Sequence, residues 1–350
     1  MNSPPEGLLP STYRGPGLVD LQMNGYAGFD FNSPPESWRA EDFLRVRAAL
    51  ARRGVVVALP TLITADPQRM VARAAAYARL LGELPELAAT FPKLHVEGPF
   101  ISPEDGPRGA HPAPFCRTPR DLPELLDRLR DASGDRIGIM TLAPELPGAL
   151  ELIARAAKLG VCVAIGHTAA EPETIAEAVA AGARMSTHLG NGSHYQLPRH
   201  ANYIQAQLAE DELLASFIAD GHHLPWYTLK NYMRAKTPDR SILVTDAISA
   251  ADAGVGRFML GEDEVEVSED LCVRRPGKPG FAGSALTLDR AVVNVVLACG
   301  VTFDEAWAMA STRPAALIGL AAQPEVRVAI SRTGARSMAM KMLGETNQTR

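Results

Sequence analysis

The 350-residue sequence lacks the features that would direct a chain into a membrane, onto nucleic acid or out of the cell. No run of eighteen apolar residues occurs, so we expect no membrane span and no membrane partner. No basic run occurs and the net charge is -5, which makes nucleic acid an unsuitable partner. The first residues also lack the basic-then-apolar layout of a signal peptide. The sequence therefore predicts a cytoplasmic protein.

Cysteine is scarce as well. The four cysteines, Cys116, Cys162, Cys272 and Cys299, are scattered and are not paired by their spacing. Cys162 falls in an apolar run, and Cys299 falls in a predicted helix. We therefore expect buried, reduced thiols, as in a reducing compartment.

Apolar residues are plentiful, at 46%, and are enough for one large α/β barrel or two smaller domains. Short apolar runs alternate with helical patterns, which predicts a (β/α)8 barrel of the TIM type. A doubly wound sheet is the alternative, but it needs a glycine-rich phosphate loop after the first strand, and QMNGYAG does not match that pattern. The predicted strands are Gly17–Met23, Val55–Leu59, Lys93–Glu97, Ile137–Leu142, Cys162–His167, Arg184–His188, Ser216–Asp220 and Ser241–Asp246.

Helix signals fill the intervals between these strands. Asp66 is a suitable N-cap and Pro67 a suitable first-turn residue for the second helix. Residues 254–281 break the alternation with a period-two pattern, which predicts a small β-hairpin inserted in the barrel. Residues 284–300 then resume as the eighth helix, and one further helix is expected over 302–320.

These boundaries divide the chain into three parts. We expect an N-terminal tail at residues 1–14, the barrel at 15–322 and a C-terminal tail at 323–350. The last segment is basic and polar. We expect it and residues 1–12 to contribute little to the core.

Ionisable residues end several of the predicted strands. Glu97, His167 and His188 occupy equivalent strand ends, and in a closed parallel barrel those ends form one rim. Two imidazoles and a carboxylate are a typical ligand set for a hydrolytic Zn²⁺ with an open coordination position. The sequence therefore predicts a metal site made by these three residues.

Three further residues could take part in the site, two of them in the chemistry itself. Asp246 ends the last apolar run, and it is either a general base for the attacking water or an aspartate that caps the next loop. His111 lies in a proline-rich loop, and it either faces the substrate or is an ordinary surface histidine. His95 shares a strand face with Glu97, and it either supports the site or packs in the core.

The first strand lacks the imidazole pair that a second metal ion would need. Gln22 and Asn24 stand at two-residue spacing there, and amides are poor ligands for Zn²⁺. We therefore expect one divalent ion per chain, with Zn²⁺ favoured and Fe²⁺, Mn²⁺ or Co²⁺ as alternatives.

Taken together, these motifs resemble the amidohydrolase superfamily and, within it, the N-acetylglucosamine-6-phosphate deacetylase family. The resemblance runs from about Gly15 to Leu320. It rests on the order of the blocks PGLVDLQMNG, PTLIT, HVEGPF, GAHP, TLAPE, IGHT, STHLGN, ADGHH, LVTDA and AGSALTLDRAV.

The resemblance assigns roles to the candidate residues. It implies that Glu97, His167 and His188 are the metal ligands, that Asp246 is the catalytic acid and base, and that His111 polarises the acetyl carbonyl. It also implies a group of substrate-binding residues, of which Arg199 would reach the phosphate of a neighbouring subunit in a homodimer. That group is Asn191, Gly192, Arg199, His222 and His223.

The implied activity is metal-dependent hydrolysis of N-acetylglucosamine 6-phosphate to glucosamine 6-phosphate and acetate. The alternatives are an amidohydrolase of a non-phosphorylated N-acetyl sugar, of another acylated amine or of a cyclic amide, and a non-catalytic sugar-binding barrel. The last is disfavoured because Asp246 and all three ligands are present. The β-sandwich that flanks the barrel in this family is expected to be vestigial or absent here.

Overall fold

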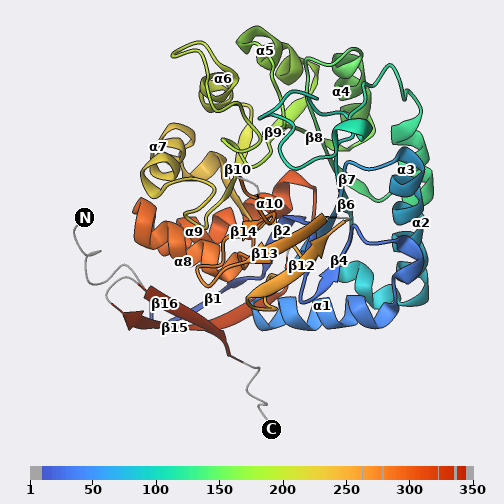
Figure 1. Cartoon of the computed structure of the whole chain (residues 1–350). Helices are drawn as coiled ribbons and strands as arrows, with labels where there is room; N and C mark the ends of the chain where they lie inside the picture. The colour runs from blue at the N-terminus through green and yellow to red at the C-terminus, as the bar shows by residue number, and fades with distance from the viewer. Residues whose placement is uncertain (1–9, 262, 278–279, 322, 335–336, 344–350) are drawn as a thin grey trace.

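Eight parallel strands form the centre of the protein, in a computed structural model that describes residues 10–261, 263–277, 280–321, 323–334 and 337–343. Their hydrogen-bonded order is β11-β10-β9-β8-β7-β6-β5-β2, as expected for successive βα units (Figure 1). All eight predicted strands are confirmed. They are β2 (Leu18–Met23), β5 (Val55–Ile63), β6 (Leu94–Glu97), β7 (Ile137–Leu142), β8 (Cys162–Ile165), β9 (Ala183–Ser186), β10 (Leu214–Ile218) and β11 (Ser241–Val244).

The sheet closes between its first and last strands. The Asp246 N–H donates to the Gln22 carbonyl at 2.9 Å, and the Asn24 N–H donates to the Ala247 carbonyl at 2.7 Å. The chain that leaves β11 therefore joins β2, and the strands form a nearly closed barrel. An open doubly wound sheet is excluded.

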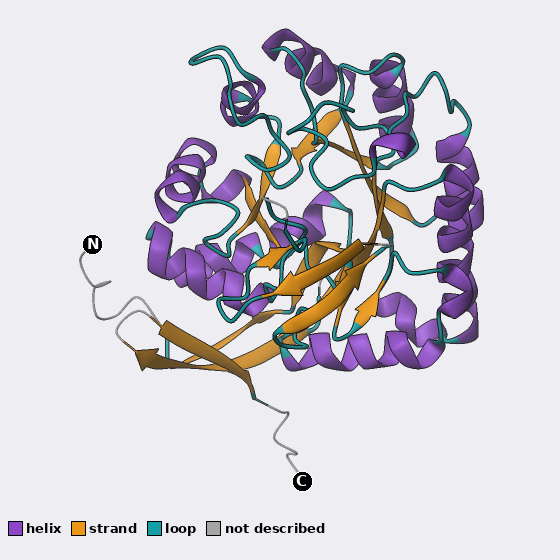
Figure 2. Ribbon diagram, in the orientation of Figure 1, coloured by secondary structure: helices purple, strands orange, loops and turns teal. Residues whose placement is uncertain are grey.

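Helices surround the strands (Figure 2). The predicted cap of α2 is confirmed, because the Asp66 carboxylate accepts from the backbone N–H of Gln68 at 3.0 Å and of Arg69 at 3.2 Å. None of the helices in the described ranges is both long and apolar enough to cross a membrane. The surrounding helices are α1 (Ala40–Arg52), α2 (Pro67–Glu83), α3 (Leu125–Ser133), α4 (Ala149–Lys158), α5 (Pro172–Ala181), α6 (Tyr203–Ala209), α7 (Trp226–Lys236) and α8 (Leu288–Cys299).

One predicted helix is divided in two. Residues 302–320 form α9 (Phe303–Met309) and α10 (Thr312–Leu317), with Ser311 between them in a non-helical conformation. Pro314 accounts for the break, since proline is tolerated in the first turn of α10 but would disrupt the interior of one continuous helix. Short elements complete the fold: β3 (Gly25–Tyr26), β4 (Phe29–Asp30), and 3₁₀ turns at Pro35–Ser37, Pro85–Ala89, Ala113–Phe115 and Pro238–Arg240.

The insertion between β11 and α8 has its own small sheet. The antiparallel strands β12 (Gly256–Leu260) and β13 (Asp263–Val267) form the predicted hairpin, and β14 (Val273–Arg274) adds a third strand. A separate apolar cluster holds this sheet to the barrel, and it includes Val265, Val273 and Ile248.

The C-terminal segment departs from its expected role. Strand β15 (Glu325–Gly334) pairs with β1 (Thr12–Pro16) on one side and with β16 (Ser337–Met342) on the other, in the three-stranded sheet at the lower left of Figure 1. Val326, Val328 and Ile330 are buried in the main core. The expectation of a tail with little core contribution is therefore wrong for β15, whose alternating residues bury one face. Residues 1–9 and 344–350 lie outside the described ranges.

Candidate metal centre and active-site pocket

The candidate residues leave the barrel at one rim. Glu97 is the last residue of β6, while His167, His188 and Asp246 each stand two residues beyond the end of β8, β9 and β11. These three have positive φ angles of 53°, 29° and 49°, a backbone conformation that non-glycine residues rarely adopt. Such conformations persist where the surrounding structure enforces them, and here they mark the turn of the chain into the pocket.

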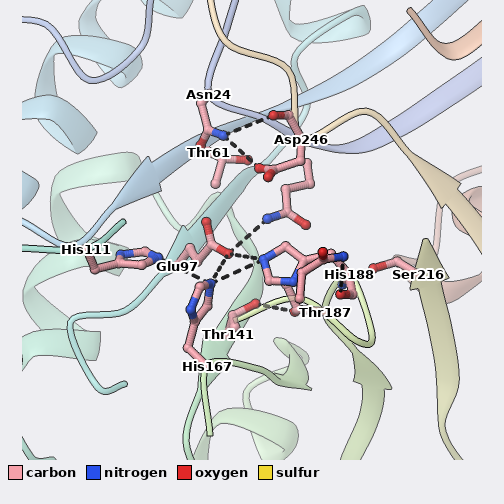
Figure 3. Close-up of polar contacts among 12 residues, drawn as sticks. Asn24, Thr61, Glu97, His111, Thr141, His167, Thr187, His188, Ser216 and Asp246 are labelled. Atoms are coloured by element: carbon pink, nitrogen blue, oxygen red, sulfur yellow. Dashed lines mark hydrogen bonds and ion pairs between the residues drawn. The ribbon is translucent and has the colours of Figure 1, made fainter. Parts of the chain in front are cut away.

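Glu97, His167 and His188 meet in a buried cluster (Figure 3). Glu97 Oε1 lies 3.2 Å from His167 Nε2 and 3.0 Å from His188 Nε2, and the two Nε2 atoms are 3.2 Å apart. Two nitrogen ligands about 2.0–2.1 Å from one tetrahedral ion stand roughly 3.3 Å apart. The spacing of these donor atoms therefore fits a single divalent ion.

The hydrogen bonds around the cluster favour the same conclusion. His167 Nδ1 donates to the Pro107 carbonyl at 2.7 Å, which leaves the lone pair of Nε2 directed at the cluster. Burial by itself would raise the pKa of Glu97, but its contacts with His167 and His188 outweigh burial and hold that pKa well below its usual value. Glu97 is thus anionic, which is the form in which a carboxylate binds a metal ion.

Gln22 and Asn24 have a role that their sequence did not reveal. Gln22 Nε2 donates to Glu97 Oε1 at 2.9 Å. Asn24 Nδ2 donates to Asp246 Oδ1 at 2.7 Å (Figure 3). The two amides therefore orient the two carboxylates of the site.

Asp246 is buried beside this cluster. Burial raises the pKa of Asp246 to about 6, and the negative charge of Glu97 raises it in the same direction. A carboxyl group whose pKa lies near neutrality can both accept and donate a proton. This environment suits a general base better than an aspartate that only caps a loop.

His111 is not an ordinary surface histidine. Its side chain is buried, and its Nε2 atom lies 3.3 Å from His167 Nε2. Burial lowers the pKa of His111 to about 3, and the neighbouring His167 lowers it further. The imidazole is therefore neutral and keeps one N–H to donate.

A cavity of about 430 Å³ opens above these groups. Glu97, His167, His188, His111 and Asp246 all line it. The sequence predicted these five residues from different parts of the chain, and the fold brings them to one pocket.

The sequence model of the Amidohydrolase family matches residues 15–323. The chain belongs to the amidohydrolase family. Amidohydrolases are metal-dependent hydrolases of carbon–nitrogen bonds, and the Glu97–His167–His188 cluster is the candidate metal centre of this one. The protein is thus an enzyme that acts on a small molecule.

Individual proteins of known activity are also similar to this chain. N-acetylglucosamine-6-phosphate deacetylase of Bos taurus is 36% identical over 319 residues, which cover 87% of this chain and 74% of that protein. N-acetylgalactosamine-6-phosphate deacetylase of Escherichia coli O157:H7 is 33% identical over 309 residues, with 87% and 78% covered. The crystal structure of N-acetyl-D-glucosamine-6-phosphate deacetylase from Mycobacterium smegmatis is similar with a TM-score of 0.80, at 27% identity, over 94% of this chain and 85% of that one.

Of the five candidate substrate-binding residues of this amidohydrolase, three line the pocket and two do not. Asn191, Gly192 and His223 line the pocket, and His223 Nδ1 lies 2.6 Å from Asp220 Oδ2. His222 does not line it: its Nε2 atom is 2.9 Å from the Asp270 carbonyl in the insertion. Arg199 is exposed and is not among the residues that line the pocket of its own chain.

His95 lies inside the barrel, below the pocket. Its Nδ1 atom is 3.0 Å from the Leu21 carbonyl and its Nε2 atom is 2.7 Å from Thr141 Oγ1. It is fully buried and does not line the pocket. This position favours a packing role within the polar interior of the barrel.

The pocket also includes residues that the sequence analysis missed. Leu260, Arg275 and Phe281 come from the insertion, and His194 and Tyr195 come from the loop after β9. One signal was available: the insertion follows β11, and segments that follow barrel strands lie on the rim that carries the chemistry.

Proposed function

We propose that this amidohydrolase hydrolyses the acetamide of N-acetylglucosamine 6-phosphate to glucosamine 6-phosphate and acetate. The observation that carries the proposal is the convergence of Glu97 Oε1, His167 Nε2 and His188 Nε2 to within 3.2 Å at the pocket that also holds Asp246. Similarity to several N-acetylglucosamine-6-phosphate deacetylases supports the choice of substrate.

Glu97, His167 and His188 would hold one divalent ion, for which the two nitrogens and one oxygen favour Zn²⁺ over Fe²⁺, Mn²⁺ or Co²⁺. Such an ion, when bound, polarises an acyl oxygen and makes water more acidic. The Asp246 carboxylate takes a proton from the attacking water as the new carbon–oxygen bond forms. Asp246 Oδ1 already accepts a hydrogen bond from Asn24, so Oδ2 is the oxygen available for this transfer.

Asp246 then gives that proton to the amine nitrogen as the carbon–nitrogen bond breaks, which releases acetate and the free amino sugar. His111 donates its N–H to the acetyl oxygen, where negative charge develops in the transition state. Its low pKa keeps it a neutral donor throughout.

The substrate phosphate is assigned to the part of the pocket wall that Asn191 and Gly192 form, next to His167 and His188. The backbone amide groups of such a loop suit an anion. Arg199 would complete the phosphate site of a neighbouring subunit, which requires a homodimer. Its exposure leaves it accessible for that contact.

A cytoplasmic setting forms part of the proposal. All four cysteines are free, and Cys272 and Cys299 are buried. Burial raises the pKa of Cys162 to about 12, so this thiol stays protonated and unreactive. Such thiols are typical of a reducing compartment.

A substrate panel tests the proposed activity. Acetate release would be measured with N-acetylglucosamine and N-acetylgalactosamine, each with and without a 6-phosphate, on the metal-loaded protein. The highest kcat/KM is expected for N-acetylglucosamine 6-phosphate. Preference for the galactosamine compound would shift the substrate towards that of the Escherichia coli relative, and no acetate from any of the four would refute the deacetylase.

Metal content gives a separate prediction. We expect about one tightly bound divalent ion per chain, because Gln22 and Asn24 donate to carboxylates and offer no imidazole for a second ion. His188→Ala should lower the occupancy strongly, since it removes one of three ligands. Elemental analysis of purified protein is the measurement, and two firmly bound ions per chain would contradict the prediction.

A further prediction concerns Arg199 and the proposed homodimer. Arg199→Ala should raise KM for the phosphorylated substrate about tenfold or more and leave KM for the unphosphorylated sugar nearly unchanged, because a guanidinium binds phosphate through paired hydrogen bonds. Arg234→Ala, which removes an exposed arginine in the last turn of α7, serves as the control. Equal effects on both substrates, or a fully active monomer in solution, would refute the role of Arg199.

A further inference from the structure

Arg275 is the one lysine or arginine among the residues that line the pocket, within the described part of the chain. It follows β14 in the insertion. Its Nη2 atom donates to the Ala110 carbonyl at 2.7 Å and also pairs with the Asp263 carboxylate on β13. Arg275 therefore connects the insertion to the residue immediately before His111.

Besides the contact of His111 with His167, the loop that Arg275 contacts, residues 104–111, has two other polar attachments in the described part of the chain. The Pro107 carbonyl accepts from His167 Nδ1 at 2.7 Å, and Glu104 Oε2 lies 3.1 Å from His194 Nε2. One attachment comes from the β8 end, one from the loop after β9, and the third from the insertion through Arg275. Of these three attachments, Arg275 is the nearest to His111 along the chain, so its loss would loosen that end of the loop.

The surroundings of Arg275 hold its guanidinium in one place. The Asp263 carboxylate pairs with the guanidinium, and only 24% of the Arg275 side chain is exposed. The guanidinium thus spans a carboxylate and a carbonyl whose residues, 263 and 110, are far apart in the sequence.

From these contacts we infer that Arg275 is a positioning residue: it fastens the insertion to the Ala110 carbonyl and thereby holds His111 over the pocket. The inference rests on the proposed function for the role of His111. Positioning of this kind contributes to rate because a displacement of about 1 Å can cost roughly a hundredfold in turnover.

Kinetics of the metal-loaded enzyme test the inference. Arg275→Met should lower kcat about 10- to 100-fold with little change in KM, since the geometry of His111 matters most in the transition state. Arg275→Lys should recover part of the loss, because an ammonium can still donate to both acceptors. Arg257→Met removes an exposed arginine of the same insertion, paired with Glu264 at 3.1 Å, and should leave kcat unchanged.

A double-mutant cycle with His111→Ala separates positioning from a direct role. If Arg275 acts through His111, Arg275→Met should cost little more once His111 is absent. Multiplicative losses in the double variant would overturn the inference, as would a wild-type kcat in Arg275→Met.

Hydrogen exchange makes the result independent of the substrate. The backbone N–H groups of Arg108, Gly109 and His111 donate within the loop, to Glu104, Gly106 and Arg108. They should exchange faster in Arg275→Met than in wild type or in Arg257→Met. Unchanged exchange would refute the role of Arg275 in holding the loop. If exchange is faster but the wild-type protein releases no acetate, the proposed deacetylase activity is refuted and the role of Arg275 in holding the loop stays supported.

Discussion

Replacement of Asp246 by asparagine is expected to lower kcat by roughly 10²–10⁴, the range for loss of a general acid–base group. Asparagine has the same shape but cannot take a proton from water or give one to an amine. Its carbonyl oxygen can still accept from Asn24, so the side chain should stay in place. KM and metal content should change far less, because Asp246 is not part of the three-residue ligand cluster.

A matched control is available in Asp30, another buried aspartate. Burial raises the pKa of Asp30 to about 6 as well, but Asp30 does not line the pocket. Asp30→Asn should therefore retain kcat, whatever its effect on the thermal midpoint. An Asp246→Asn enzyme that keeps most of its turnover and its metal would show that another group moves the proton.

The barrel could be predicted because the signals for each strand lie within the sequence of that strand. Most of these strands are short apolar runs, and polar residues at or just beyond the ends of several of them face the rim. Glu97 and Asp246 stood out for this reason, since a carboxyl group after an apolar run needs a partner or solvent. The ligand cluster followed from the order of the strands alone.

What the sequence left open depended on contacts between distant segments. His111 could be a surface histidine until its burial beside His167 was known. The amides of Gln22 and Asn24 were considered only as weak metal ligands, because their carboxylate partners are 75 and 222 residues away. His222 and His223 are adjacent in sequence, yet only His223 reaches the pocket, since the turn directs their side chains to different neighbours.

The role of the C-terminal strand β15 also depends on a contact between distant segments. Val326, Val328 and Ile330 alternate with more exposed residues, which is a usable strand signal. The signal seemed unimportant because its antiparallel partner, β1, lies at the other end of the described chain, with Tyr13 opposite Val328. Nothing local indicates that pairing.

This strand therefore supports a prediction about stability. Val328→Asp should destabilise the protein by about 3–5 kcal/mol, because it places a carboxylate at a position that is 2% exposed and has apolar neighbours. For a chain of this length, that corresponds to a fall of roughly 4–7 °C in the thermal midpoint, measured by calorimetry. A loss of soluble protein on expression would be the stronger form of the same result.

The neighbouring residue provides the control. Arg327 is exposed on the opposite face of β15, so Arg327→Asp adds the same side chain without burying it. A change within about 0.5 kcal/mol is expected, because exposed substitutions away from special contacts are close to neutral. The new carboxylate would lie opposite Arg14, whose charge offsets its repulsion by Glu325 on the same face. If the two variants melted together near the wild-type temperature, β15 would be an accessory strand and the core would end with the barrel.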